Sequence, residues 1–385
     1  MTQSLLAGTR VLDLSRVLAG PWAAQLLADL GADVIKVERA GGGDDTRAWG
    51  PPWHTPETAA YFTCANRGKR SVSADFSHPE DLAHIVRLAA EADVFIENFK
   101  VGQLQKFGLD AAALHAINPG LIYCSITGYG QTGPLRDQPG YDFAIQALSG
   151  LMSITGEPDR EPQKVGVAVI DVATGLYASN AIMAALLRRH RTGQGATIDC
   201  SLLDAGVALL ANQASNYLVG QVVPKAMGNA HPSIVPYQSF ACADGHVVMA
   251  VGNDRQFSLL ATALGETWHL DARFATNPER VKHRSVLVPL IQACLQQQPC
   301  QHWIDLFARA GVPCTPIQTI DQVMATEQVT ARGLVVSSVS ADGSTIRGVG
   351  QPMLIDGMRP AQPVAAPPLG PRIDATTAFD ASVLN

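Results

Sequence analysis

The stretch that decides the fold runs Val11-Leu-Asp-Leu-Ser-Arg-Val-Leu-Ala-Gly-Pro-Trp-Ala-Ala-Gln-Leu-Leu-Ala-Asp-Leu-Gly-Ala-Asp-Val-Ile-Lys-Val37. Its first four residues and residues 32–37 are short apolar runs of the kind that form buried strands. Residues 21–30 between them predict a helix, because Pro21 stands near its first position and Gly31 follows its end. The stretch is therefore expected to form a β-α-β unit.

The same alternation continues along the chain. A helix followed by a strand is predicted twice more, over residues 79–92 and 93–96 and over residues 109–117 and 121–126. Two further helices are predicted over residues 175–190 and 202–219. Strands that alternate with helices indicate a mostly parallel sheet covered by helices, so the predicted fold class is α/β.

A change of pattern suggests a second domain. Proline, glycine and asparagine interrupt the sequence around residues 220–236, and Asp244-Gly245 then separates two apolar runs, which is a hairpin signal. We expect a first part of a large domain at residues 1–220, a smaller α+β domain at 221–325, and a segment returning to the large domain at 326–385. Within the last segment, the proline-rich residues 361–370 should be extended rather than helical.

Composition narrows the functional classes. The 385 residues are 47% hydrophobic and carry a net charge of −6, which gives no electrostatic support for a nucleic-acid or anionic membrane partner. We expect no membrane span, because no uninterrupted apolar stretch of about 18 residues occurs, and no secretory signal. The seven cysteines include no Cys-x-x-Cys pair, so we expect reduced thiols and a cytoplasmic protein.

Several familiar cofactor motifs are missing from the sequence. The turn of the β-α-β unit reads Ala19-Gly20-Pro21 instead of the glycine pattern of dinucleotide-binding proteins, although Glu38 ends the second predicted strand. There is no nucleophile elbow of the Gly-x-Ser-x-Gly type and no histidine or cysteine cluster with metal-ligand spacing. We therefore expect no metal and no permanently bound cofactor.

A lone carboxylate stands out in the stretch Val165-Gly-Val-Ala-Val-Ile-Asp-Val-Ala-Thr-Gly175. Asp171 ends an apolar run just before the predicted helix. Local physics suggests an N-cap, in which its side-chain oxygen accepts a backbone N–H of the first turn. The same position suits a nucleophilic carboxylate, because a helix N-terminus favours an anion. The residues alone leave both interpretations open.

Motifs over nearly the whole chain resemble those of the family III CoA-transferases. These are Asp13-Leu-Ser-Arg-Val-Leu-Ala-Gly-Pro21, Leu30-Gly-Ala-Asp-Val-Ile-Lys-Val-Glu38, Asn66-Arg-Gly-Lys-Arg-Ser71, Asp93-Val-Phe-Ile-Glu-Asn-Phe99, Ser125-Ile-Thr-Gly-Tyr-Gly-Gln-Thr-Gly-Pro134, Gly140-Tyr-Asp-Phe143, Arg191-Thr-Gly-Gln-Gly195 and Gly228-Asn-Ala-His-Pro232. The resemblance implies a Rossmann-like large domain and a small domain in a ring-like, interlocked homodimer. It also implies that Asp171 carries the chemistry.

The resemblance further implies a site for coenzyme A, which enters as part of the substrate. Positions that match the family's CoA site are Val17, Leu18, Arg39, Asn98, Phe99 and Lys106. The phosphates of CoA need local positive charge, and we expect Arg39 with the basic loop residues Arg67, Lys69 and Arg70 to supply it near strand ends. Without the resemblance, the basic loop would be interpreted as a solvated surface.

Three positions bear on the substrate and the reaction. Related racemases have Gly-His-Asp where this chain has Gly140-Tyr141-Asp142, and a tyrosine, with a reference pKa of about 10, is poorly matched to exchanging a proton at neutral pH. Formyl-CoA transferases of the family have glutamine at the position of Leu18. His231 is either a structural residue or a donor in the acyl pocket.

The expected activity is therefore the transfer of CoA from an acyl-CoA donor of the succinyl-CoA type to a free carboxylic acid. The pattern around His231 resembles the branch that acts on small dicarboxylates such as glutarate. Asp171 would attack the thioester, and an aspartyl-CoA intermediate would follow. The alternatives are an α-methylacyl-CoA racemase and a catalytically silent CoA-binding protein.

Overall fold

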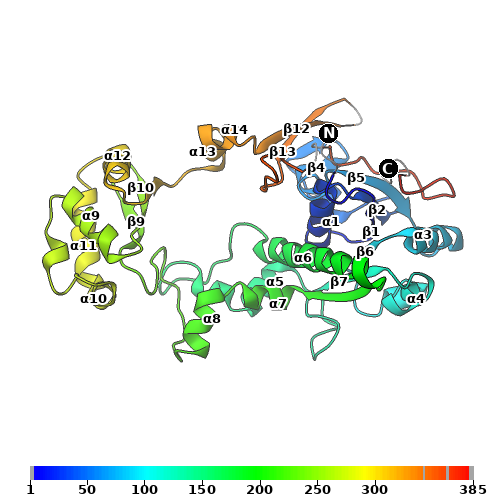
Figure 1. Cartoon of the computed structure of the whole chain (residues 1–385), viewed down its shortest axis with the longest axis horizontal. Coiled ribbons are helices and arrows are strands. Elements are labelled where there is room, and N and C mark those ends of the chain that lie inside the picture. The colour runs from blue at the N-terminus through cyan, green and yellow to red at the C-terminus, as the bar shows by residue number, and fades with distance from the viewer. Residues whose placement is uncertain (1–3, 341–342, 361–363, 381–385) are drawn as a thin grey trace. The chain divides into compact units, whose positions relative to one another are not determined.

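The computed structural model describes residues 4–340, 343–360 and 364–380, and these form two compact units (Figure 1). One unit comprises the chain up to residue 151, residues 165–220 and the chain from residue 327. The other comprises residues 152–164 and 221–326. The chain therefore leaves the first unit and returns to it twice, once for a short excursion and once for a long one.

The first unit is built on a six-stranded parallel sheet with the order β5-β2-β1-β6-β7-β8. The strands are β1 (Arg10–Asp13), β2 (Asp33–Arg39), β5 (Lys69–Ala74), β6 (Val94–Glu97), β7 (Ile122–Thr127) and β8 (Ala196–Ser201). This confirms the predicted α/β class. The strand order reverses between β1 and β6, and ligands of open α/β sheets bind at the carboxyl ends of the strands at such a point.

Helices cover both faces of the sheet, which explains why its strands are apolar on both sides. Helices α1 (Ala19–Asp29) and α6 (Val169–Thr192) share one core cluster with Val11. Helices α3 (Pro79–Glu91) and α4 (Ala111–Ile117) share the other with Leu12. Because neighbouring residues of a strand point to opposite faces, Val11 and Leu12 belong to different cores.

Helix α6 begins earlier than the sequence predicts. It starts at Val169, so Asp171 lies in its first turn instead of preceding the helix. Within the described part of the chain, α6 is the one helix long and apolar enough to cross a membrane by length and composition. Its residues Ile170, Ala178 and Ile182 lie in the protein core, as such residues of a core helix do.

Other boundaries also differ from the prediction. Strand β5 occupies the second half of the basic motif at residues 66–71, and β8 is absent from the predicted elements. The predicted helix over residues 202–219 is two helices, α7 (Leu202–Ala208) and α8 (Ala211–Leu218). The shorter elements of this unit are η1 (Asp45–Ala48), β3 (Trp53–Thr55), β4 (Thr58–Ala59), α2 (Ala60–Thr63), η2 (Leu104–Phe107), α5 (Asp142–Leu148), η3 (Leu151–Ile154, which ends in the second unit), α14 (Glu327–Ala331), β12 (Val335–Val339) and β13 (Thr345–Val349).

The C-terminal segment lies against β5. Arg372 forms a parallel bridge with Ser73, and Ile373 belongs to the core shared by α3 and α4. Residues 364–370 contain no regular element, as expected, while residues 361–363 lie outside the described part of the chain.

The second unit is a small α+β structure. Strands β9 (Tyr237–Ala241) and β10 (His246–Ala250) form the hairpin predicted at Asp244-Gly245, and β11 (Cys314–Pro316) pairs with β10. The helices are α9 (Asp254–Ala263), η4 (Trp268–Leu270), α10 (Asn277–Lys282), α11 (Arg284–Leu295), α12 (Cys300–Ala310) and α13 (Ile320–Met324).

Candidate active site

A cavity of about 220 Å³ lies where the strand order of the sheet reverses. The loop after β1 lines it with residues 16–19, and the loop after β6 lines it with residues 98–101. The cavity brings together six of the residues expected at the site: Val17, Leu18, Asn98, Phe99, Tyr141 and Asp171. The physical reason is the parallel sheet, which gathers the carboxyl ends of sequentially distant strands at one edge.

Asp171 is the third residue of α6, and its residue surface is 9% exposed. The N-cap interpretation is wrong, because the cap position is Ala168 and no side chain caps the helix from there. Asp142 instead accepts hydrogen bonds from the backbone N–H of Ile170 at 2.8 Å and of Asp171 at 3.2 Å. Asp142, which is distant in the sequence, therefore caps the N-terminus of α6.

This arrangement sets the charge state of Asp171. Burial, followed by the negative charge of Asp142, raises the pKa of the Asp171 carboxyl to about 7. A helix N-terminus normally favours a carboxylate, but here Asp142 already occupies two of the terminal N–H groups. Desolvation thus outweighs the helix dipole, and near neutral pH a substantial fraction of Asp171 is a poorly solvated carboxylate.

The loop after β1 is held by Asn98, one of the residues expected to bind CoA. Its Oδ1 accepts a hydrogen bond from the N–H of Arg16 at 2.9 Å, and its Nδ2 donates to the carbonyl oxygen of Arg16 at 2.7 Å. The amide of Asn98 is therefore engaged with the loop that carries Val17 and Leu18. Val17 itself has a φ of 70°, which is rare for a β-branched residue.

Arg39 lies at a second cavity of about 380 Å³ next to the first. The two cavities share Arg16, Phe99 and Gln103. The Arg39 side chain is 62% exposed, and its nearest partner is Asp45 at 3.6 Å, so its guanidinium is accessible to a ligand. Lys106 is exposed on η2 and lines neither cavity.

Lys69 does not fit the expected role in phosphate binding. Its side chain has no exposed surface, and its Nζ donates to Asp13 Oδ2, to the carbonyl oxygen of Pro21 and to Asn66 Oδ1, each at 2.9 Å. Burial lowers its pKa to about 8. Three buried acceptors use the three donors of the ammonium group, so Lys69 is an internal structural cation.

Arg67 and Arg70 lie at the wrong edge of the sheet for the expected role. Lys69 pairs with Val34 at the beginning of β2, which places the start of β5 at the amino edge, whereas Arg39 ends β2 at the carboxyl edge. There Arg67 forms an ion pair with Asp29 at 2.5 Å, and Arg70 pairs with Asp33 at 2.7 Å. Residues 66–68 lead into β5 instead of following a strand, which places the start of this basic motif at the amino edge.

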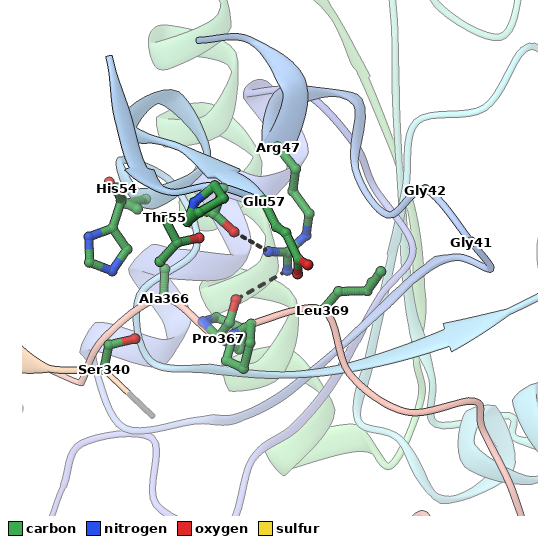
Figure 2. A pocket seen from close by; sticks show the side chains of 14 residues that line it. Gly41, Gly42, Arg47, His54, Thr55, Glu57, Ser340, Ala366, Pro367 and Leu369 are labelled. Atoms are coloured by element: carbon green, nitrogen blue, oxygen red, sulfur yellow. Dashed lines mark hydrogen bonds between the residues drawn. The ribbon is translucent and has the colours of Figure 1, made fainter. Parts of the chain in front are cut away.

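A larger cavity of about 610 Å³ lies beside the loop at Gly41 and Gly42 (Figure 2). Arg47 is the buried cation on its wall, but the guanidinium already forms two hydrogen bonds of 2.7 Å with Glu38. It also donates to Thr58 Oγ1 and, as Figure 2 shows, to the carbonyl oxygen of Pro367. The carboxylate that lines this cavity, Glu57, is exposed. It is therefore a poorer candidate for covalent chemistry than the cavity at Asp171.

His231 belongs to the second unit, ahead of β9. Its Nδ1 accepts a hydrogen bond from the N–H of Ser233 at 3.0 Å, which assigns the hydrogen of the neutral ring to Nε2. Arg284 donates to the carbonyl oxygens of His231 and Pro232, and Tyr237 packs edge-on against the ring. Burial and the nearby Arg284 charge lower the pKa of His231, so the ring presents a neutral N–H donor.

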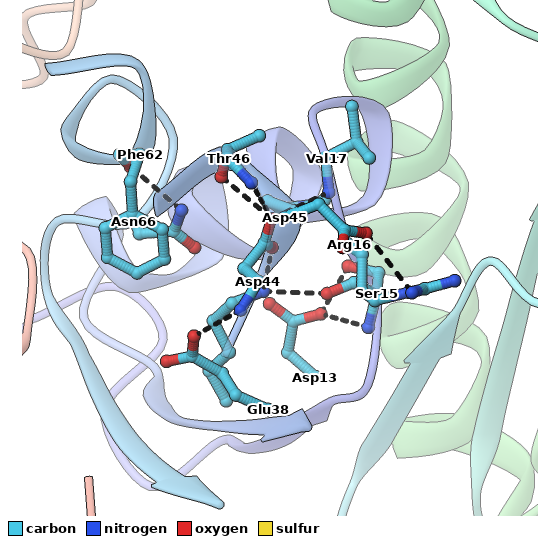
Figure 3. A network of polar contacts seen from close by, with 12 residues as sticks. Asp13, Ser15, Arg16, Val17, Glu38, Asp44, Asp45, Thr46, Phe62 and Asn66 are labelled. Atoms are coloured by element: carbon cyan, nitrogen blue, oxygen red, sulfur yellow. Dashed lines mark hydrogen bonds and ion pairs between the residues drawn. The ribbon is translucent and has the colours of Figure 1, made fainter. Parts of the chain in front are cut away.

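The residues that sequence reasoning missed are buried charges that contact the loop after β1. Asp44 lies between Glu38 and the loop after β1 (Figure 3). Lys36 interrupts the apolar run of β2 and is fully buried. A lysine inside an apolar strand is the feature of the sequence that could have indicated a buried charge here. Within residues 4–340, 343–360 and 364–380, no cluster of histidine, cysteine or carboxylate side chains could hold a metal ion.

Comparisons with known proteins identify the family of this chain. The chain is 50% identical to the succinate–glutarate CoA-transferase of Agrobacterium fabrum over 91% of this chain and 89% of that protein. It is 45% identical to the human succinyl-CoA:glutarate CoA-transferase over 89% of this chain and 80% of that protein. The crystal structure of a CAIB/BAIF family protein from Brucella suis superposes with a TM-score of 0.84 at 49% identity, covering 94% of this chain and 96% of that one. The sequence model of CoA-transferase family III matches residues 6–372, and the chain belongs to this family.

Proposed function

We propose that this enzyme transfers CoA from succinyl-CoA to a small dicarboxylic acid such as glutarate. The observation that carries the proposal is a buried carboxylate, Asp171, whose pKa is raised to about 7, at the point where the strand order reverses. The names of the most similar relatives support the choice of donor and acceptor.

Asp171 acts as the nucleophile in the proposed mechanism. Its carboxylate attacks the thioester carbonyl of the donor, which gives a mixed anhydride and CoA thiolate. The thiolate attacks the aspartyl carbonyl, so that aspartyl-CoA forms and the donor acid leaves. The acceptor carboxylate then attacks aspartyl-CoA, and the released thiolate attacks the acceptor carbonyl of the new anhydride, which regenerates Asp171.

The two adjoining cavities suit the ends of the CoA molecule. The reacting thioester would lie at Asp171 in the first cavity, bordered by Val17 and Leu18. The phosphates would reach the second cavity, where Arg39 is accessible, and Phe99 borders both spaces. A guanidinium fork is well matched to phosphate oxygens. Lys69, Arg67 and Arg70 have no part in this proposal.

The decisive experiment tests Asp171 with two variants. Asp171→Ala and the near-isosteric Asp171→Asn should both lose transfer from succinyl-CoA to glutarate while CoA binding persists. Hydroxylamine added during turnover should label Asp171 in the wild type, and peptide mass spectrometry would locate the adduct. Full transfer by the alanine variant would overturn the proposal.

The racemase alternative has a separate test. Tyr141, not histidine, lines the cavity with Asp171. Exchange of the α-proton of a 2-methylacyl-CoA in D2O without any acceptor acid would favour the racemase. No exchange together with new thioester formation is the result we expect.

We further propose an interlocked homodimer in the cytoplasm. The outer surfaces of α6, α7 and α8 expose large apolar side chains, which a second chain would cover: Leu176, Tyr177, Val207, Tyr217 and Leu218. All seven cysteines are free, as in a reducing compartment.

A further inference from the structure

In the loop between β1 and α1, side chains from outside the loop bind the backbone of three consecutive residues, Ser15, Arg16 and Val17. Asp13 accepts a hydrogen bond from the N–H of Ser15, and Lys36 donates to the carbonyl oxygen of Ser15 at 2.7 Å. Asn98 binds both backbone groups of Arg16. Asp44 accepts from the N–H of Val17 at 3.3 Å. The backbone just ahead of the cavity is therefore set by buried polar groups and not by the loop's own preference.

Val17 is the strained point of this loop. Its φ of 70° lies in the left-handed region, which a β-branched side chain disfavours. Such a conformation persists only where the surroundings over-determine it, and it is found preferentially at functional sites. Val17, Leu18 and Ala19 form part of the wall of the cavity that Asp171 also lines, so the strained residue lies where the chemistry is proposed.

Asp44 can keep Val17 in its left-handed conformation, because its own carboxylate is fixed by several contacts. Its carboxylate is 3.0 Å from Lys36 Nζ, and both side chains are fully buried. Its Oδ1 also accepts hydrogen bonds from the N–H and hydroxyl of Thr46, and its own N–H donates to Glu38. Figure 3 shows Asp44 between Glu38 and the backbone of Val17. Each contact limits the movement of the carboxylate to which Val17 is bound.

We infer that Asp44 is a positioning residue for CoA transfer, because it holds Val17 in the left-handed conformation and so keeps residues 17–19 in place in the cavity that Asp171 also lines. The inference rests on the proposed function and extends it to a residue outside the cavity lining. A carboxylate that only stabilised the fold would affect turnover through unfolding alone. A positioning carboxylate should affect turnover in the folded enzyme.

A glycine at position 17 distinguishes a positioning role of Asp44 from a purely stabilising one. Glycine adopts positive φ about as readily as negative φ, so Val17→Gly lowers the need for Asp44 to impose the conformation. Asp44→Ala should lower kcat for transfer from succinyl-CoA to glutarate by roughly tenfold or more, with a smaller change in KM. Adding Val17→Gly to Asp44→Ala should recover most of that loss relative to Val17→Gly alone.

The control is Asp93→Asn. Asp93 is a largely buried carboxylate at the amino edge of the same sheet, where it pairs with Arg10 and Arg189. This variant should lose thermal stability and keep kcat, since it touches neither cavity. Melting temperatures of every variant would show that rates are measured on folded protein. If Asp44→Ala does not fold, Asp44→Asn with and without Val17→Gly provides the same comparison.

The outcomes are distinct. Wild-type kcat in folded Asp44→Ala, or an equal loss with valine and with glycine at position 17, would overturn the inference. A fall in kcat that glycine reverses would support it. Neither result depends on which residue is the nucleophile, so full activity of Asp171→Ala would remove the proposed function separately.

Discussion

Asp171 combines two opposed properties at the scale of a single residue. The proposed nucleophile must be ionised, yet burial and the charge of Asp142 raise its pKa to about 7. A carboxylate with few solvating partners is more reactive toward a carbonyl than a hydrated one, and it is also harder to form. Ionisation of Asp171 should therefore change both the rate of transfer and the free energy of unfolding over the same pH range.

The first prediction concerns the pH dependence of turnover. The rate should fall as the pH drops below about 7, because protonation removes the nucleophile. Asp142→Asn removes the neighbouring negative charge while the amide oxygen can still accept the two helix N–H groups, so the acid limb should move to lower pH. Asp305→Asn, an exposed acid in the second unit, is the control and should leave the limb in place.

A second prediction follows for stability. The pKa of Asp171 is higher in the folded state than its ordinary value of 3.8, so its ionisation opposes folding increasingly as the pH rises from about 4 to about 7. Asp171→Asn should therefore raise the free energy of unfolding by about 4 kcal/mol at pH 8 but only by about 2 kcal/mol at pH 5, for a shift of about three pKa units. Urea unfolding at the two pH values would measure it, and equal effects at both would contradict the linkage.

His231 offers a third prediction, on the choice of acid. Its fixed tautomer presents an Nε2–H donor that would suit the free carboxylate of a dicarboxylic acid. His231→Ala should reduce transfer to glutarate about ten- to a hundredfold more than transfer to a monocarboxylate of equal length. A parallel loss for both acids in competition assays would leave His231 with a structural role only.

At the scale of elements, the contact between α1 and α6 sets the position of Asp171. A Cβ atom added to Gly175 of α6 would lie 2.8 Å from the carbonyl oxygen of Ala19 and 3.0 Å from Trp22 Cδ1. The absence of a side chain at this position therefore lets the two helices approach closely. The proposed nucleophile lies one turn before this contact, and the strained loop lies just before α1.

The fourth prediction uses this contact. Gly175→Ala should destabilise the protein by about 1–3 kcal/mol through overpacking and lower kcat, because α6 must shift away from α1. Gly166→Ala is the matched control, since its Cβ would meet nothing within 4 Å and the residue precedes the same helix. Thermal melting and steady-state kinetics would compare the two, and similar behaviour of both variants would refute the packing argument.

At the scale of the whole molecule, the fifth prediction is the homodimer. Large apolar side chains exposed on α6, α7 and α8 would be covered by a second chain. Interlocked chains cannot separate without unfolding, so light scattering should give a dimer mass at micromolar and at nanomolar concentration. A monomer mass at micromolar concentration would contradict the arrangement.

The sequence by itself determined the α/β class and the family. Apolar runs that alternate with helix patterns are local features of the sequence, and they predict a parallel sheet covered by helices on both faces. The strands β1 and β2 and the helix between them were predictable for this reason. Strand β5 was not, because Lys-Arg-Ser-Val-Ser-Ala is too polar to be recognised as a buried strand before its lysine is seen to pair with Asp13.

Only the tertiary structure decided which charges are available and which are internal. Lys69 and Arg39 look alike in the sequence, but one is neutralised inside the protein and the other is accessible at the carboxyl edge. Asp142 caps a helix 29 residues away, and Asp44 holds a backbone group 27 residues away. Ion pairs and caps between distant residues leave no periodic pattern in the sequence, because the chain brings the partners together only when the sheet has formed.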